Sequence, residues 1–348
     1  KKRLPRCARN DDQNRTSASF QSLHADSNMN EQPRLPNFPV SFFSMIMGLS
    51  GFTLVMMKVE ELGLTPYAPV ELSAAITIAL FVVLIGAYTA KLIRHPDAVR
   101  AELDHPVMLS FFPTITISLI LIGTFLATWT PTIALISWQV GAAGQLLLTL
   151  LILTRWIHHD HFEIHHISPA WFIPVVGNIL VPLAGVENAS MELNWFFFST
   201  GLLFWIVLFT IIMYRMVFHR PMAENLLPTM FIMIAPPAVG FISYMNLVPD
   251  LDNFARVLYY NALFMTLLLL VQLPRFIKIP FSLSWWAYSF PLAAVSVATL
   301  LMYEETGKPY FRFISYLLVA LVSVLILYLL YRTFLAARRN QICIPAKS

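Results

Sequence analysis

The sequence predicts an all-α integral membrane protein whose ten transmembrane helices form five hairpins repeated in parallel. Three observations support this fold class. Of the 348 residues, 57% are hydrophobic and only 12% are Asp, Glu, Lys or Arg, which is about half the charged fraction of soluble domains. The apolar runs are long enough to cross a hydrocarbon core of about 30 Å as helices. They do not alternate apolar with polar residues, as the strands of an outer-membrane barrel would.

Ten apolar segments can be marked along the chain, each long enough for one membrane-spanning helix. Their ends are predicted to within a few residues. Numbered in chain order, they form an odd set and an even set. The segments are expected at residues 39–57, 67–93, 107–129, 131–157, 169–187, 193–218, 227–247, 254–274, 284–303 and 311–335.

Two polar tails flank the predicted channel domain, which covers residues 35–337. Residues 1–34 contain many polar and few apolar side chains, a composition typical of a disordered segment. Within that tail, residues 1–28 are interpreted as an extension or an expression remnant ahead of a candidate start at Met29. Residues 338–348 form the second tail.

The positive charges predict the orientation. Of the 23 Lys and Arg residues, 19 lie in the tails and in the connections after even segments, whereas Lys58, Arg256, Lys308 and Arg312 lie on the other side. Cytoplasmic loops carry an excess of Lys and Arg. We therefore expect a multi-pass membrane protein with both termini in the cytoplasm, and the resemblance described below implies the bacterial cytoplasmic (inner) membrane. The 19-to-4 split also favours an even number of helices, because a missing helix would scramble the alternation.

Proline occurs inside the odd segments, whereas even segments carry it only near their starts or not at all. An interior proline removes a backbone hydrogen bond and kinks a helix. In a membrane this is tolerated where protein or a water-filled cavity satisfies the freed carbonyl. The predicted kink positions are Pro113, Pro174, Pro237 and Pro291.

The odd segments also hold most of the small and polar residues. Close helix packing favours such residues too, and for any single position that explanation is the simpler one. Their recurrence in all five odd segments instead favours an inner ring of five kinked odd helices around a pore, inside an outer ring of five even helices. Each repeat begins and ends on the same side, so the repeats are related by an axis along the membrane normal. The pore-lining candidates are Ser41, Ser44, Gly48, Thr114, Thr116, Ser118, Gly177, Asn178, Gly240, Ser243 and Ser296.

The interior of the odd segments contains no Asp, Glu, Lys, Arg or His. Proton-coupled carriers and pumps normally place ionisable residues within the bilayer, and cation pores use acidic rings. A neutral pore binds ions weakly, which suits fast conduction through a channel better than transport coupled to protons. A dicarboxylate carrier would be expected to offer Arg or Lys, and Arg215 and Arg256 lie near segment ends.

A histidine-rich run, HHDHFEIHH at residues 158–166, follows the fourth segment. It is either a metal site, such as one histidine box of a membrane di-iron enzyme, or a solvated loop whose charge varies with pH. The solvated loop is favoured, because such enzymes need several separated boxes and the other histidines are scattered singly. No Walker loop, dinucleotide fingerprint or nucleophile elbow is present. We therefore expect no catalytic residue, no metal and no cofactor, and hence no enzyme. No nucleic-acid partner is expected either, because the positive charges flank the membrane.

Two stretches, PVSFFSMIMG at residues 39–48 and WWAYSFP at residues 285–291, are similar to the first and ninth helices of the tellurite-resistance/dicarboxylate transporter family. That family includes the slow anion channels of plant guard cells, and the resemblance covers about residues 29–340. It implies a homotrimer in which each protomer passes small anions through its own pore. Chloride and nitrate are the expected anions, with tellurite as a further candidate.

The resemblance also implies that Phe290 lies across the pore as a gate. By residue type alone Phe290 is one of 27 Phe residues, and a core- or lipid-facing position would be the simpler interpretation. Pro291 biases its predecessor away from helical geometry, so a local break is expected to turn the ring toward the pore axis. The sequence thus favours an anion channel in the lipid bilayer. The alternative is a secondary transporter that exports tellurite or carries a C4-dicarboxylate.

Overall fold

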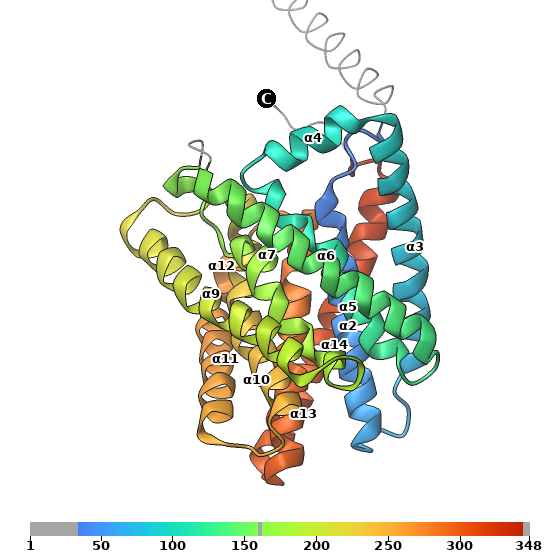
Figure 1. The fold of residues 1–348 in the computed structure, drawn as a ribbon, viewed down its shortest axis with the longest axis vertical. Helices are drawn as coiled ribbons and strands as arrows, with labels where there is room; N and C mark the ends of the chain where they lie inside the picture. Colours follow the sequence, from blue (N-terminus) through green and yellow to red (C-terminus); the bar gives the residue numbers. More distant parts are fainter. Residues whose placement is uncertain (1–33, 159–161, 344–348) are drawn as a thin grey trace, which may run out of the picture.

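The computed structural model describes residues 34–158 and 162–343, and the regular structure of these residues is entirely helical (Figure 1). Ten spans within the described residues are long and apolar enough to cross a membrane. Each predicted segment corresponds to one of them, so the all-α membrane fold and its span count are confirmed. Residues 1–33 of the first tail, residues 344–348 of the second, and His159, Asp160 and His161 lie outside the described residues.

The even spans are single continuous α-helices. Two of them begin with proline, at a position where the missing N–H has no helical partner in any case. No other proline occurs in this set. The five helices are α3 (Val70–Arg94), α6 (Pro131–His158), α9 (Met191–Phe218), α11 (Asn253–Val271) and α14 (Pro309–Arg338).

The odd spans share a different design, since each begins in 3₁₀ geometry and continues as α-helix. The first is η1 (Val40–Phe42) with α2 (Phe43–Glu61), and the third is η2 (Met108–Phe111) with α5 (Pro113–Leu126). The fifth is the most broken, comprising η4 (Pro169–Trp171), α7 (Phe172–Val176), η5 (Gly177–Leu180) and α8 (Pro182–Asn188). The seventh is η6 (Glu224–Ile234) with α10 (Ala235–Leu247), and the ninth is η7 (Leu283–Tyr288) with α13 (Ser289–Thr306). The loops add α4 (Pro96–Asp104), η3 (Ile164–His166) and α12 (Leu273–Phe276).

The predicted kink prolines all sit at junctions between these two geometries. Pro113, Pro174, Pro237 and Pro291 each fall within the first three residues of an α-helical stretch that follows a 3₁₀ stretch. N–H groups of a first turn have no intrahelical acceptor, so proline sacrifices no hydrogen bond there. The prolines therefore mark where winding changes and do not bend a continuous α-helix.

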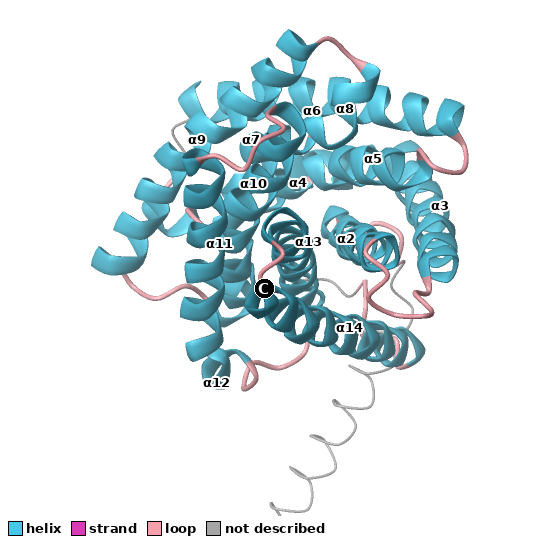
Figure 2. Ribbon diagram, turned by 90° about the horizontal axis from the view of Figure 1, so that it is seen from below, coloured by secondary structure: helices cyan, strands magenta, loops and turns pink. Residues whose placement is uncertain are grey.

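Burial separates the two sets of spans. In the most apolar stretch of each odd span 72–89% of the residues are buried, against 28–39% in the even spans. Figure 2, viewed along the long axis of the molecule, shows α3, α6, α9, α11 and α14 at the periphery and α2, α5, α10 and α13 inside them. The odd spans thus form the interior of the bundle, and the even spans expose apolar side chains around it.

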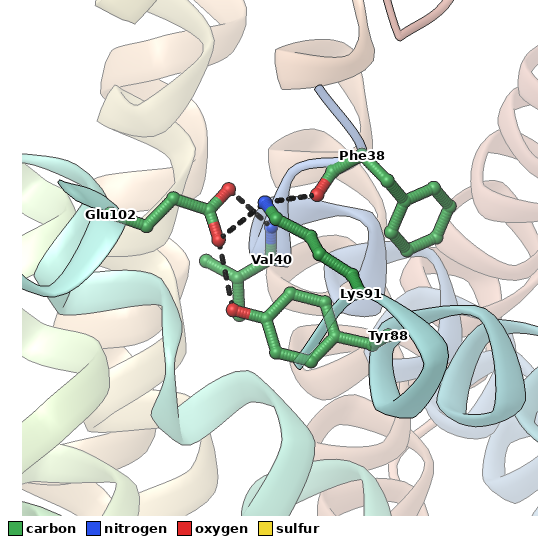
Figure 3. Close-up of polar contacts among 5 residues, drawn as sticks. All are labelled: Phe38, Val40, Tyr88, Lys91 and Glu102. Carbon is green, nitrogen blue, oxygen red and sulfur yellow. Dashed lines mark hydrogen bonds and ion pairs between the residues drawn. The ribbon is translucent and has the colours of Figure 1, made fainter. Parts of the chain in front are cut away.

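Buried polar contacts fix the end of the bundle that holds the described termini, called here the terminal end. Lys91, in the last turn of α3, is almost fully buried and lies 3.1 Å from the carboxylate of Glu102 on α4. The Lys91 ammonium donates to the carbonyl of Phe38 at 2.8 Å, and Tyr88 donates to Glu102 at 2.8 Å (Figure 3). Glu102 also accepts from the backbone N–H of Val40 at 3.3 Å. The buried Lys91–Glu102 ion pair thus holds the start of the first span against α3 and α4.

The opposite end, called here the far end, is held by contacts between odd spans. Lys58 near the end of α2 lies 2.7 Å from the carboxylate of Glu304 near the end of α13. Asn246 of α10 donates to the carbonyl of Leu183 on α8 at 3.1 Å. The odd spans are therefore joined to one another directly at this end.

A candidate path between the odd spans

Two cavities lie one after the other between the odd spans. The proximal cavity, nearer the terminal end, has a volume of about 40 Å³, and the distal cavity has about 230 Å³. Both exceed the 10–15 Å³ or so that one water needs. Every lining residue of either cavity belongs to an odd span, and all five odd spans contribute to each. The ring of even helices contributes none.

Residue numbers show how the spans run past the cavities. Along α2 the lining passes from Met47 at the proximal cavity to Gly51 and Lys58 at the distal one. Along α5 it passes in the same sense, from Ile117 to Leu121. The fifth, seventh and ninth spans follow the same order. The five odd spans therefore run parallel, as the five-hairpin repeat requires.

Phe290 borders both cavities. It shares this position with Leu180 and Val239, and no other described residue lines both. The side chain is 8% exposed and belongs to the second residue of α13. Three apolar side chains thus separate the proximal cavity from the distal cavity.

The backbone at Phe290 differs from the sequence-based expectation. We expected Pro291 to push it out of helical geometry, but Phe290 is helical and the break lies just before it, at the η7–α13 junction. Pro291 is the third residue of α13, so its missing N–H breaks no intrahelical hydrogen bond, and Phe290 before it keeps helical geometry. The position of the ring therefore follows from the change of winding at that junction.

Gly51 on α2 provides the surface beside the ring. A Cβ added there would lie 3.2 Å from Cδ2 of Phe290 and 3.0 Å from Cβ of Ala293. Both distances are tighter than ordinary Cβ contacts. The absence of a side chain at Gly51 gives the ring its place, and sequence reasoning missed this residue. The signal was a second glycine three residues after Gly48, one helical turn nearer the far end.

The walls of the two cavities differ in polarity. The proximal cavity is lined by aliphatic and aromatic side chains with Pro236 and Gly177. The distal cavity adds the polar side chains of Thr124 and Asn246 and two charged ones, Lys58 and Glu61. An ion in the proximal cavity would have few polar partners, whereas one in the distal cavity would have several.

Lys58 is the cation closest to this path within the described lining. Its ammonium lies 2.7 Å from Glu304 and 3.0 Å from Glu61, and its side chain is 16% exposed. The sequence-based boundary of the first segment ended one residue earlier, so Lys58 was assigned to a loop. In the structure α2 continues to Glu61 and carries this charge into the distal cavity.

The predicted pore-lining residues mostly occupy other places. Gly177 lines the proximal cavity, where its missing side chain leaves room for Gln145 and Ile117. The other ten line neither cavity. Ser41 and Ser44 are half-buried, Gly48 abuts Ser289, and Gly240 faces Leu258 of the even helix α11.

The remaining candidates form hydrogen bonds within or between helices, and of their polar atoms Oδ1 of Asn178 is buried without a partner among the described residues. Ser118 donates to the carbonyl of Thr114 at 2.6 Å, and Ser296 donates to the carbonyl of Leu292 at 2.7 Å. A buried hydroxyl commonly satisfies itself on a carbonyl of the preceding turn. The other four make equivalent contacts: Thr114 with Phe111, Thr116 with Pro113 and Gln145, Asn178 with Thr149 and Val175, and Ser243 with Ile179.

The described part of the histidine-rich run lies at the terminal end, where His158 and His165 are exposed and His166 is half-buried. His158 closes α6 with Nδ1 2.9 Å from the carbonyl of Thr154, and His165 lies 3.1 Å from Glu163. Among the described residues no group of three or more His, Cys, Asp or Glu is arranged to hold a metal ion. The described geometry therefore offers no metal centre beside the path.

Comparison with known proteins places this geometry in context. A family model described as SLAC1, voltage-dependent anion channel, matches residues 37–334. The S-type anion channel SLAH3 of Arabidopsis thaliana is 27% identical over 88% of this chain and 49% of its own length. The tellurite resistance protein TehA homolog of Haemophilus influenzae is 24% identical over 83% of this chain and 90% of its own. A protein named as an uncharacterised transporter of Methanocaldococcus jannaschii is 25% identical over 82% and 90%.

Proposed function

Because the chain belongs to the SLAC1 voltage-dependent anion channel family, we propose that it is a channel for small monovalent anions whose path runs between the five odd spans and is closed at Phe290. One observation carries the proposal. Phe290 borders both the proximal and the distal cavity, and the five odd spans alone line the two. An apolar ring at such a point blocks ions by filling space and by excluding the water that they need.

The chemistry of the walls favours anions that lose water easily. The proximal cavity offers few polar groups, so an ion there recovers little of its hydration free energy. Chloride and nitrate are the proposed permeant anions, with tellurite as a further candidate. Lys58 offsets part of the negative charge of Glu61 and Glu304 at the distal cavity, which would lower the barrier to anion entry there.

The alternative is a secondary transporter, which would need a different arrangement of charged side chains along the path. A carrier for a C4-dicarboxylate needs cations that bind two carboxylates. Lys58, the one cation in the described lining of the distal cavity, already lies against two carboxylates. This arrangement of charges therefore supports conduction of anions more than tight binding of a dicarboxylate.

The assembly and membrane placement belong to the same proposal. We propose a homotrimer in the bacterial cytoplasmic membrane with one path per protomer and both termini in the cytoplasm. The exposed apolar side chains of the even spans, Val82, Leu147, Leu203, Phe264 and Leu327 among them, would then face lipid or the neighbouring subunits.

Electrophysiology of the purified protein in planar bilayers tests the function. Under a tenfold gradient of potassium chloride, an anion-selective channel gives a reversal potential near the chloride equilibrium potential. A reversal potential near that of potassium would exclude the anion channel. Flux that moves one anion uphill when a proton gradient is imposed would instead identify a coupled transporter.

A further inference from the structure

A third and larger cavity lies at the terminal end, away from the proposed path. It has a volume of about 1030 Å³ and lies between residues 105–107 before η2, residues 162–166 around η3 and the segment that follows α9. In Figure 1 the ends of α6 and α9 lie at the same end of the bundle. Its lining includes Arg215, His219 and Arg220 from the end of α9 and beyond, together with His105 and His165 from the two loops.

Arg215 is the residue that demands an explanation. It is 5% exposed, and its Nε and Nη1 atoms have no hydrogen-bond partner among the described residues. A buried guanidinium without an anion is costly, because removing a charge from water is offset only by pairing. Arg215 lines the cavity, so a ligand in that cavity is the partner within its reach.

The other polar groups of the lining favour a negative ligand. Arg220 contributes a second guanidinium at the exposed rim. The Nδ1 atom of His105 accepts from the backbone N–H groups of Val107 and Met108 at 3.1 and 3.2 Å, which places its proton on Nε2 and makes it a donor. The carboxylate in the lining, Glu163, already lies 3.1 Å from His165.

We infer that this cavity binds a phosphate group, with Arg215 as its buried anchor and Arg220 as a rim contact. Guanidinium groups bind phosphate through paired, charge-assisted hydrogen bonds. The cavity is much larger than one phosphate ion, so the ligand is a phosphate that carries a larger group. Ile164 is 45% exposed and lines the cavity itself, so part of the cavity wall is an apolar side chain open to the surroundings. The headgroup of an anionic phospholipid fits both surroundings.

Native mass spectrometry tests the inference. It measures lipid binding to the purified, delipidated protein, in whichever oligomeric state the protein is obtained. The probes are phosphatidylglycerol, phosphatidylcholine and inorganic phosphate, and the variants are Arg215→Gln, Arg220→Gln and the control Arg100→Gln. Arg100 is exposed on α4 at the same end but does not line the cavity. We expect phosphatidylglycerol to bind better than phosphatidylcholine, and Arg215→Gln to weaken it by about tenfold or more. Arg220→Gln should weaken it less, and Arg100→Gln by less than about twofold.

A melting experiment separates a ligand anchor from a structural residue. Without phosphate or anionic lipid, Arg215→Gln should melt no lower than the unsubstituted protein, because an unpaired buried charge has been removed. The rise in melting temperature that phosphatidylglycerol produces should disappear in this variant. Equal binding of phosphatidylglycerol to both proteins, or a destabilised variant that still responds to the lipid, would overturn the inference. Saturable, Arg215-dependent binding of inorganic phosphate without preference for phosphatidylglycerol would support phosphate recognition and assign the ligand to the aqueous phase.

Discussion

Gly51 of α2 and Phe290 of α13 lie face to face, so closely that a Cβ on Gly51 would sit 3.2 Å from the Phe290 ring. The ring is therefore held on one side by backbone, while two cavities adjoin it. A side chain packed in an ordinary core has neighbours on all sides. This asymmetry gives the ring room to move along the path but not toward α2.

Truncation of the ring should open the path. Phe290→Ala is expected to raise anion conductance by about tenfold or more, which corresponds to a barrier lowered by about 1.4 kcal/mol. Phe290→Leu should raise it less, because it retains more apolar bulk. Conductance and melting temperature are measured on both variants. If Phe290 were a simple core residue, Phe290→Ala would instead cost about 3–5 kcal/mol of stability and give no new current. A well-folded Phe290→Ala protein with unchanged conductance would exclude the gate.

Adding a methyl group at Gly51 should act in the opposite direction. Gly51→Ala removes the room on the α2 side of the ring and pushes it further across the path, so conductance should fall several-fold. The same substitution in the Phe290→Ala background should change conductance little, because the ring is absent. A double-mutant cycle on conductance measures this coupling. Additive effects of the two substitutions would show that Gly51 does not act through the ring.

Charge substitutions at the far end should change conductance with opposite signs. Lys58→Gln leaves Glu61 and Glu304 unpaired in or near the distal cavity and should lower anion conductance by roughly twofold or more at low salt. Glu304→Gln relieves Lys58 of one of its two partners and should raise it. Both effects should shrink as salt rises and the Debye length falls below about 10 Å. Lys308→Gln, an exposed cation outside the cavity lining, is the control. Changes of the same sign would rule out the electrostatic role.

Selectivity should follow the cost of dehydration. Apolar walls in the proximal cavity cannot repay a tightly held hydration shell, so iodide and nitrate should pass more readily than chloride, and chloride more readily than sulfate. Reversal potentials under bi-ionic conditions in the Phe290→Ala channel give the order. A higher permeability for sulfate than for chloride would contradict this prediction, because it would require polar ligands that the described lining of the proximal cavity does not offer.

Topology can be checked independently of current. Reporter fusions after residues 100, 160 and 220 should all score cytoplasmic, because the Lys- and Arg-rich connections lie on that side. Glu60, Glu187, Asp250 and Glu305 should be accessible from outside. A single external score among the three fusions would contradict the five-hairpin arrangement in the membrane.

The sequence was informative about the fold because its main signals are collective. Hydropathy revealed all ten spans. Interior prolines separated odd from even spans because the odd spans change from 3₁₀ to α geometry part-way along, and the first α turn after that change tolerates proline. The site was harder, since its geometry depends on which face of each odd helix turns inward. Ser118 and Ser296 looked suited to a polar pore, yet each satisfies its hydroxyl on its own helix. Gly51 and Lys58 carry the informative contacts, but Phe290, Ala293 and Glu304, which they contact, lie on α13, more than 200 positions away in the chain.

The 3₁₀ start of the ninth span has a consequence for the ring that follows it. The six residues of η7 end directly before Ser289 and Phe290. Six residues make about two turns and rise about 12 Å in 3₁₀ geometry, but make about one and two-thirds turns and rise about 9 Å in an α-helix. Any opening that rewound η7 as α-helix would therefore act as a screw. It would turn the Phe290 ring by about a third of a revolution while drawing it roughly 3 Å toward the terminal end.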